Sequence, residues 1–510
     1  MATQAYKISI CFFNTTHIID FFTFTAMNLL HRIKDITSSL LSPAETIPAE
    51  ALAKYPLRAY NAARHGQRHT ALCYAPATNM YFSQTGEVGV CCHNMEFSAG
   101  RYPAQTLKEI WNSDAAKAMR EDMRQYKLGK GCEICEADLV TGSFEEVRAR
   151  HFDHIPRRTD YPTQMEFLLT NTCNLECVMC KGEFSSSIRQ NREKLPPIQN
   201  VYDNAFLEQL KEFIPYLHET RFSGSGEAFL IDVNYKIWEL IIALNPKCKI
   251  MVQTNGTVLN SKTKDLLEKG NFHIGVSLDS LKKEVFEAIR PGAKFERVME
   301  NIHYFNAYCQ RNKRKFNIST CVMRQNWEEL PAFVKFSNKL GAIQNFHKVW
   351  FPREHALFNL PEAELLSIHT YLAPHNFPTQ TLLQKMNNNH YAYFVDTVQR
   401  WYKDAHLGLT PTDEIVKDEA ALSLPDIELK PYLFKKIDVC FVSKSHSPRI
   451  KNSMPNEELK LKINELICAL DSEKTAATAL RQMCVVDTLD LISALNNHTT
   501  SKLLAMANDF

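Results

Sequence analysis

The sequence lacks the features that mark several large classes of protein. Its 59 Lys and Arg nearly balance 57 Asp and Glu, giving a formal charge of +2, so no strong positive field indicates a nucleic-acid or membrane-surface protein. No stretch reaches the ~18 apolar residues that a membrane span needs. We find no clean secretion signal, internal repeat or low-complexity tract. We therefore expect a cytoplasmic protein with no membrane and no nucleic-acid partner, and interpret residues 1–26 as an extension or an overlong start.

The fifteen cysteines are unevenly distributed along the 510 residues. An odd number without a secretion signal argues against a disulfide framework. Seven are scattered singly, and we interpret them as small buried hydrophobes. The other eight fall within about a fifth of the chain, and such short spacings favour metal or redox chemistry. These eight are Cys73, Cys91, Cys92, Cys132, Cys135, Cys173, Cys177 and Cys180.

Strand-like and helix-like stretches alternate from residue 163 to about 375. About six βα units predict parallel strands with right-handed crossovers, and therefore a full or partial barrel with its chemistry in loops after the strands. We interpret the basic stretch 185–194 as a solvated helix face, and Arg290-Pro291-Gly292 as a helix stop. We expect five segments: an extension at 1–67, a cysteine-bearing α+β module at 68–140, a linker at 141–162, the barrel at 163–375 and a mostly helical region at 376–510.

Cys173, Cys177 and Cys180 directly follow the first predicted barrel strand. A structural zinc site and an ordinary iron–sulfur cluster are each held by four ligands. Three thiolates could hold three irons of a [4Fe–4S] cluster and leave the fourth iron open to a small-molecule chelate. A zinc loop with its fourth ligand elsewhere is the alternative.

This cysteine loop, the segment "GSGEAF" after the second strand and the six-unit barrel together resemble the radical S-adenosylmethionine (SAM) superfamily over residues 163–350. The resemblance implies an α/β fold with a partial (β/α)6 barrel. It also implies a [4Fe–4S] cluster on the three cysteines that binds S-adenosylmethionine and cleaves it reductively to a 5′-deoxyadenosyl radical.

The same resemblance assigns cofactor-binding positions. Met179 takes the hydrophobic place before the last cysteine of the loop, and Gly226 and Glu227 match the glycine segment that receives the methionine amino group. Ser225 and Ala228 replace a glycine and a proline of that segment, so its backbone geometry is an open question at this point. Two further residues lie where members carry polar groups near the ribose: Ser277 and Asp279.

The earlier cysteines resemble a SPASM/twitch module, in which a glycine precedes a cysteine ligand by five positions, as Gly86 precedes Cys91, and "LKEIW" also resembles this module. The glycine spacing favours Cys91 over Cys92. The resemblance implies a second [4Fe–4S] cluster, of the single-cluster twitch type, although such a module normally follows the barrel. A four-thiolate zinc site is the alternative. The implied ligands are Cys73, Cys91, Cys132 and Cys135.

The resemblance implies a radical SAM enzyme, an oxidoreductase or modifying enzyme, in which the radical abstracts a hydrogen atom from a peptide, protein or sugar-like small molecule. The auxiliary cluster would assist the oxidation, and an electron donor such as flavodoxin or ferredoxin would be a partner. Two alternatives remain: a catalytically inactive, metal-stabilised binding or regulatory protein on the same barrel, and a radical enzyme whose N-terminal site holds zinc. For the C-terminal region, packing, a lid and a partner surface are all compatible with the pattern.

Overall fold

A computed structural model describes residues 47–406 apart from 65–68, 95, 130, 141 and 159, together with 425–443, 454–469 and a few positions between 480 and 496. The predicted N-terminal extension therefore lies largely outside the described residues. The chain divides into two compact units. One comprises the residues up to Tyr74 together with Arg120–His154, and the other comprises Ala75–Met119 and Ile155–Phe510.

A nine-stranded sheet runs through the described part of the second unit in the order β3-β2-β1-β4-β5-β6-β7-β8-β9. Strands β4 to β9 are parallel neighbours in sequence order, as the predicted six βα units require, and this confirms the α/β barrel. The strands are β1 Asn79–Phe82, β2 Glu87–Gly89, β3 Gly100–Arg101, β4 Gln164–Phe167, β5 Glu219–Phe222, β6 Lys249–Thr254, β7 Phe272–Ser277, β8 Phe316–Val322 and β9 Ile343–Lys348.

The N-terminal hairpin extends this sheet. Strand β1 pairs with β4 in parallel, with Tyr81 opposite Glu166, whereas β1–β2 and β2–β3 are antiparallel. Residues 75–119 thus group with the barrel. The domain limits expected from the sequence, with a separate module at 68–140, stay a prediction.

Several helices begin or end at residues that cap them. Asp203 caps α9 by accepting from the Phe206 amide, Asn260 caps α11, and Gly341 ends α14 with a left-handed φ of 72°. In the second unit the helices are α4 Ala75–Thr78, α5 Leu107–Trp111, α8 Ser186–Asn191, α9 Asn204–Phe213, α10 Asp232–Leu244, α11 Ser261–Lys269, α12 Lys283–Ile289, α13 Phe295–Arg311, α14 Leu330–Leu340, α15 Glu362–Leu372, α16 Leu382–His406, α18 Asp426–Ser443 and α20 Asn456–Cys468. The division between the units falls within α6 Asp114–Arg124, after Met119.

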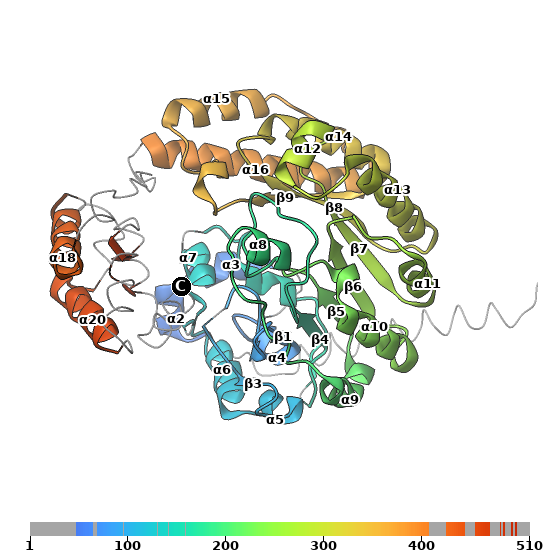
Figure 1. Ribbon diagram of the computed structural model, residues 1–510, viewed down its shortest axis with the longest axis horizontal. Helices are drawn as coiled ribbons and strands as arrows, with labels where there is room; N and C mark the ends of the chain where they lie inside the picture. Colours follow the sequence, from blue (N-terminus) through green and yellow to red (C-terminus); the bar gives the residue numbers. More distant parts are fainter. Residues whose placement is uncertain are drawn as a thin grey trace, which may run out of the picture. The chain divides into compact units, whose positions relative to one another are not determined.

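Helices α9, α10, α11, α13 and α14 cover the outer side of the sheet (Figure 1). The strand residues that face them are apolar and buried, and β6 and β8 alternate buried and partly exposed positions along their length. Trp238 of α10 is fully buried and packs edge-on against Phe222 of β5 and Phe272 of β7. The partly exposed positions include Gln253 of β6 and Asn317 and Ser319 of β8.

The first unit is built from α2 Ala49–Lys54, α3 Leu57–Ala63 and α7 Glu133–Val140 around a small apolar core. A buried ion pair supports it: Arg64 Nη2 lies 2.6 Å from Asp153 Oδ1, and neither side chain is exposed. The Arg64 guanidinium also donates to the Ala71 carbonyl at 2.8 Å. This pair therefore fixes the segment that leads to Cys73.

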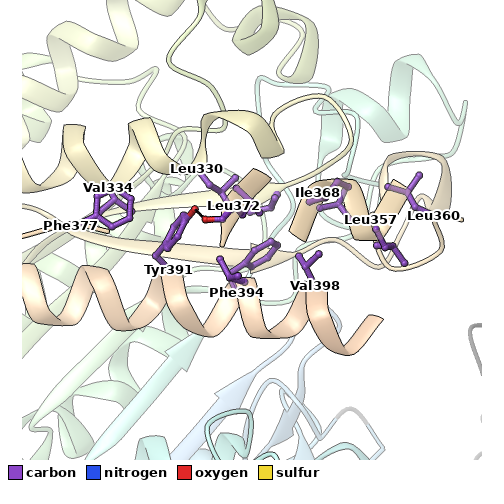
Figure 2. Close-up of a cluster of buried hydrophobic side chains, with 13 residues drawn as sticks. Leu330, Val334, Leu357, Leu360, Ile368, Leu372, Phe377, Tyr391, Phe394 and Val398 are labelled. Atoms are coloured by element: carbon purple, nitrogen blue, oxygen red, sulfur yellow. Dashed lines mark hydrogen bonds between the residues drawn. The ribbon is translucent and has the colours of Figure 1, made fainter. Parts of the chain in front are cut away.

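The first part of the C-terminal region belongs to the barrel wall. Asn387 of α16 accepts from the Gln344 amide at 2.8 Å and donates to the Ala342 carbonyl at 2.9 Å, so it satisfies backbone groups at the exposed edge of β9. Figure 2 shows Phe394 and Val398 of α16 among the side chains of a buried cluster that includes α14 and α15.

Helices α18 and α20 form an apolar cluster with Leu433, Ile437 and Ile463 at its centre. The prediction of a mostly helical C-terminal region is confirmed for the described residues. None of the helices in the described ranges combines the length and the apolar character that a bilayer crossing requires.

Candidate functional site

The loop between β4 and α8 carries the three clustered cysteines, and serines at the start of α8 hold its backbone. Ser186 Oγ and Ser187 Oγ both donate to the Cys173 carbonyl, at 3.1 and 2.8 Å. Ser185 Oγ donates to the Leu175 carbonyl at 2.7 Å while it caps α8. The interpretation of residues 185–194 only as a solvated helix face missed these contacts. The run of three serines at the start of the helix was the feature that could have indicated them.

The glycine segment after β5 packs directly against the cysteine loop. The Gly226 amide donates to the Phe184 carbonyl at 3.0 Å, and the Glu227 amide donates to the Thr172 carbonyl at 2.7 Å. Gly226 has a φ of 63°, and a Cβ here would lie 2.6 Å from the Thr172 oxygen and 3.0 Å from the Thr170 oxygen. Only glycine fits this approach of two backbones.

Ser225, which departs from the superfamily's glycine, uses its hydroxyl. Ser225 Oγ donates to the Thr170 carbonyl at 3.1 Å and accepts from Gln84 Nε2 at 2.8 Å. Gln84 lies in the turn between β1 and β2 and also donates to the Glu183 carbonyl at 2.8 Å. The N-terminal hairpin is thereby tied to both loops of the site.

Glu227 is 1% exposed and links the loops after β5 and β6. Its carboxylate accepts from Thr254 Oγ1 at 2.5 Å, from the Asn255 amide at 2.6 Å and from the Phe229 amide at 3.2 Å. Burial raises the pKa of Glu227, and the hydrogen bonds from Asn255 and Thr254 oppose that rise. The proposed contact with a cofactor amine stays a prediction. The observed contacts show that Glu227 also positions the neighbouring turn.

The turn after β6 reaches the cysteine loop through side-chain amides. Asn255 Nδ2 donates to Asn174 Oδ1 at 3.1 Å, and Asn174 Nδ2 donates to Thr257 Oγ1 at 3.0 Å. Asn255 Nδ2 also lies 4.0 Å from Cys173 Sγ. Thr254, Asn255 and Thr257 of this turn are thus part of the site.

The segment after α12 borders the other side of the cysteine loop. The Val178 amide donates to the Ile289 carbonyl at 2.9 Å, and the Glu176 amide donates to the Pro291 carbonyl at 3.0 Å. Gly292 has a φ of 96°, and a Cβ there would lie 3.0 Å from the Asn174 oxygen. A helix stop alone does not account for this segment, because it pairs with the cysteine loop like a short strand.

Ser277 and Asp279, expected near a ribose, have different environments. Ser277 Oγ is partly exposed and accepts from Gln253 Nε2 at 2.9 Å. Asp279 is fully buried; Oδ1 accepts from the Cys321 amide at 2.8 Å and Oδ2 accepts from Arg290 Nε at 2.7 Å. Both oxygens of Asp279 are engaged within the protein. The ribose contacts of the two residues stay predictions.

The three thiols are near one another and near one cation. Burial raises the pKa of Cys177 to about 11, and the Arg290 charge opposes the rise. Burial raises the pKa of Cys180 to about 12, with further contributions from Cys177 and Cys173. Burial also raises the pKa of Cys173. Within the described residues, no three Cys, His, Asp or Glu side chains are grouped as a site for a single metal ion.

Met179 packs at the base of the cysteine loop. It contacts a small buried cluster formed by Ile289, Met323 and Val349, next to Val178 and Cys321. The predicted hydrophobic position before Cys180 therefore anchors the loop in the barrel. Its proposed cofactor contact stays a prediction.

Cys321 of β8 was interpreted as one of the scattered buried cysteines, but it is only partly buried. Burial raises its pKa to about 12, and the charge of Asp279 adds to that rise. Cys177 and Cys180 contribute as well, so a fourth thiol lies close to the cysteine loop. Cys248, Cys309, Cys440 and Cys484 are buried as expected. The expectation is wrong for Cys468, which is exposed near the end of α20, and Cys11 lies outside the described residues.

The N-terminal cysteines belong to different units. Cys73, Cys132 and Cys135 fall in the first unit, where Cys135 is buried in the apolar core and Cys73 packs against it. Cys91 and Cys92 fall in the second unit, in which Cys91 is buried and Cys92 partly buried. The proposed four-cysteine ligand set stays a prediction.

Comparisons with known proteins agree with this arrangement. Residues 167–337 match the model of the Radical SAM superfamily, and residues 73–136 match that of the SPASM iron–sulfur cluster-binding domain. The first range contains the cysteine loop, the glycine segment and the turn after β6. These matches support [4Fe–4S] clusters and S-adenosylmethionine as the cofactors.

The curated relatives are similar over part of their length. The GTP 3′,8-cyclase of Limosilactobacillus fermentum is 30% identical over 190 residues, which are 36% of this chain and 53% of that protein. The cysteine-type anaerobic sulfatase-maturating enzyme of Clostridium novyi is 26% identical over 252 residues, or 46% of this chain and 58% of that protein. The chain thus spans about half the length of these two relatives.

Solved structures are similar at a lower level. The structure described as native anSMEcpe with bound AdoMet has 19% identity and a TM-score of 0.32, with 41% of this chain and 59% of that chain covered. SuiB of Streptococcus suis bound to S-adenosylmethionine has 15% identity and a TM-score of 0.31, with 52% and 61% covered. The two family models therefore support a radical SAM protein with a SPASM iron–sulfur module: residues 167–337 match the first family and residues 73–136 match the second.

Proposed function

We propose that the protein is a radical SAM enzyme that abstracts a hydrogen atom from a peptide, protein or sugar-like substrate, with one auxiliary cluster assisting the oxidation. The observation that carries this proposal is the cysteine loop at the carboxyl edge of the parallel strands. Its backbone is hydrogen-bonded to the glycine segment on one side and to the Arg290 segment on the other. These backbone contacts on both sides fix the course of the loop.

The residues present fit a [4Fe–4S] cluster with one open iron. Cys173, Cys177 and Cys180 supply three thiols from one loop, the usual donors for iron–sulfur clusters. When bound, the cluster with S-adenosylmethionine supplies a 5′-deoxyadenosyl radical. The raised pKa values of Cys177 and Cys180 mean that metal binding must displace their protons.

The inner face of the sheet indicates the chemistry of the substrate. Gln253, Ser277, Asn317 and Ser319 present uncharged amides and hydroxyls; Gln253 Nε2 donates to Ser277 Oγ at 2.9 Å, and Asn317 Nδ2 donates to Ser319 Oγ at 3.3 Å. These groups suit the amides of a peptide or the hydroxyls of a sugar. They support a polar, uncharged reacting group.

A nucleoside triphosphate is less well supported by this face. Arg221 of β5 has its charge compensated by Glu219 at 2.7 Å, so it is a poor partner for phosphate. This observation favours a peptide or protein over GTP as the substrate.

The N-terminal cysteines would hold the auxiliary cluster in this proposal, with Cys73, Cys91, Cys132 and Cys135 as ligands. The match of residues 73–136 to an iron–sulfur domain supports iron over zinc. A flavodoxin- or ferredoxin-type donor would reduce the first cluster, and we expect the reaction in the cytoplasm. Iron and zinc analysis of the reconstituted protein decides between about eight irons and about four irons with one zinc.

The direct test is reductant-dependent formation of 5′-deoxyadenosine after anaerobic reconstitution. The wild type is compared with the Cys173→Ala, Cys177→Ala, Cys180→Ala triple variant. We expect product from the wild type alone, and a loss of about four irons per chain in the variant. No product from a fully iron-loaded wild type would instead support the inactive binding protein on the same barrel.

A further inference from the structure

A buried cation lies beside one of the three loop thiols. Arg290 is 7% exposed, and its Nη1 lies 3.7 Å from Cys177 Sγ. Its Nε donates to Asp279 Oδ2 at 2.7 Å. The other oxygen of Asp279 accepts from the Cys321 amide at 2.8 Å, so the carboxylate is fixed to β8. The guanidinium of Arg290 is thus held by Asp279 through Nε, while its Nη1 is directed at the sulfur of Cys177.

The pair is poorly explained as a stabilising contact alone. Burying two charges costs several kcal/mol of desolvation per ion, and replacing a buried pair with apolar groups is often neutral or stabilising. The backbone of the Arg290 segment is already bound to the cysteine loop through Ile289 and Pro291. The loop therefore needs no side-chain ion pair to keep its course, and the charge calls for another role.

We propose that Arg290, held by Asp279, raises the reduction potential of the iron–sulfur cluster bound by the cysteine loop. This inference rests on the proposed function. Reduction adds one electron to the cluster, and a fixed positive charge donating to a ligand sulfur stabilises the reduced form. Arg290 acts through Cys177 and is a positioning residue, not a catalytic one.

The two members of the pair predict opposite effects. Arg290→Gln removes the positive charge and leaves Asp279 negative, so the potential falls. Asp279→Asn removes the negative charge and leaves Arg290 beside the sulfur, so the potential rises. Arg290→Lys keeps the charge and remains near the wild-type value. A purely structural role would impair the cluster in the same direction in the Gln and Asn variants.

The experiment is an anaerobic redox titration of the reconstituted full chain without S-adenosylmethionine. Electron paramagnetic resonance monitors the reduced cluster at each potential. The signal of this cluster is the one absent from the variant that lacks Cys173, Cys177 and Cys180. At the wild-type midpoint we expect the reduced-to-oxidised ratio to fall at least tenfold in Arg290→Gln, which corresponds to 59 mV for one electron. It rises in Asp279→Asn. Arg311→Gln, which removes an exposed arginine paired with Glu268, is the matched control and leaves the ratio unchanged.

The outcomes separate this inference from the proposed function. A lower potential in Arg290→Gln together with a higher potential in Asp279→Asn supports it, and the reverse pair of shifts overturns it. Unchanged potentials, or shifts of the same sign, with normal iron content overturn it and leave the proposed function intact. If Arg290→Gln binds no iron, Asp279→Asn decides alone: a higher potential supports the inference, and an unchanged or lower one overturns it. Absence of the signal from the wild type overturns both proposals.

Discussion

Replacing Gly226 with alanine tests how the site is held together. A left-handed alanine costs about 1–2 kcal/mol. The new Cβ would also meet the backbone oxygens of Thr172 and Thr170 at 2.6 and 3.0 Å, and these cannot move as a side-chain end can. A shift of the loop weakens the hydrogen bonds from the Gly226 and Glu227 amides, at about 1 kcal/mol each. The expected loss of stability is about 2–4 kcal/mol.

Gly341→Ala is the matched control in the same unit. Gly341 also has a left-handed φ of 72°, but a Cβ there meets only Gln310 Nε2, the end of a flexible side chain. Urea unfolding by circular dichroism compares the two free energies, and iron per chain after reconstitution reports on the site. We expect Gly226→Ala to lose at least about 1 kcal/mol more than the control, and to bind less iron. Equal stability with full iron binding would refute the argument that this backbone contact holds the cysteine loop.

Three further predictions concern stability. Burial lowers the pKa of His273 to about 4. Because the unfolded histidine takes up its proton near pH 6.5, the free energy of unfolding should fall by up to about 3 kcal/mol between pH 6.5 and 4. Urea unfolding measured across that range should show that His273→Asn removes this pH-dependent component. Asp153→Asn removes the charge that pairs with the unexposed Arg64 and should cost about 3 kcal/mol of stability. Native-state proteolysis within residues 120–154 should then be faster by about a hundredfold. An unchanged rate of cleavage would contradict this prediction. Ser225→Ala removes one partner of Gln84 and should lower the free energy of unfolding by about 1 kcal/mol, with full iron retained after reconstitution.

The barrel and its cysteine loop could be predicted because their signals are local. Strand-like and helix-like stretches alternate regularly along the barrel region, and the loop from Cys173 to Cys180 contains three thiols within eight residues. The pairing of β1 with β4 could not be predicted in the same way. It joins Asn79 to Gln164 across a long separation in sequence, and nothing in either strand alone specifies the partner.

The contacts that support the site were missed for a related reason. The short polar residues Ser185 and Ser225 are ordinary helix caps and loop residues until the chain brings carbonyls to their hydroxyls. Arg290 ends a helix in sequence, and only the fold places its guanidinium beside Cys177. The cysteines and the glycine segment could be recognised in the sequence from residue type and spacing. The side chains that hold them in place could not, because their roles depend on contacts between segments that are distant in the sequence.

The most direct measurement is electron paramagnetic resonance of the reduced, reconstituted protein with and without S-adenosylmethionine. The central claim is that Cys173, Cys177 and Cys180 hold a cluster with one iron open to that cofactor. We predict a change in the spectrum of the wild type on addition of S-adenosylmethionine, and no such change in the variant that lacks the three cysteines. A wild-type spectrum that does not respond, or a response that persists without the three thiols, would contradict the claim.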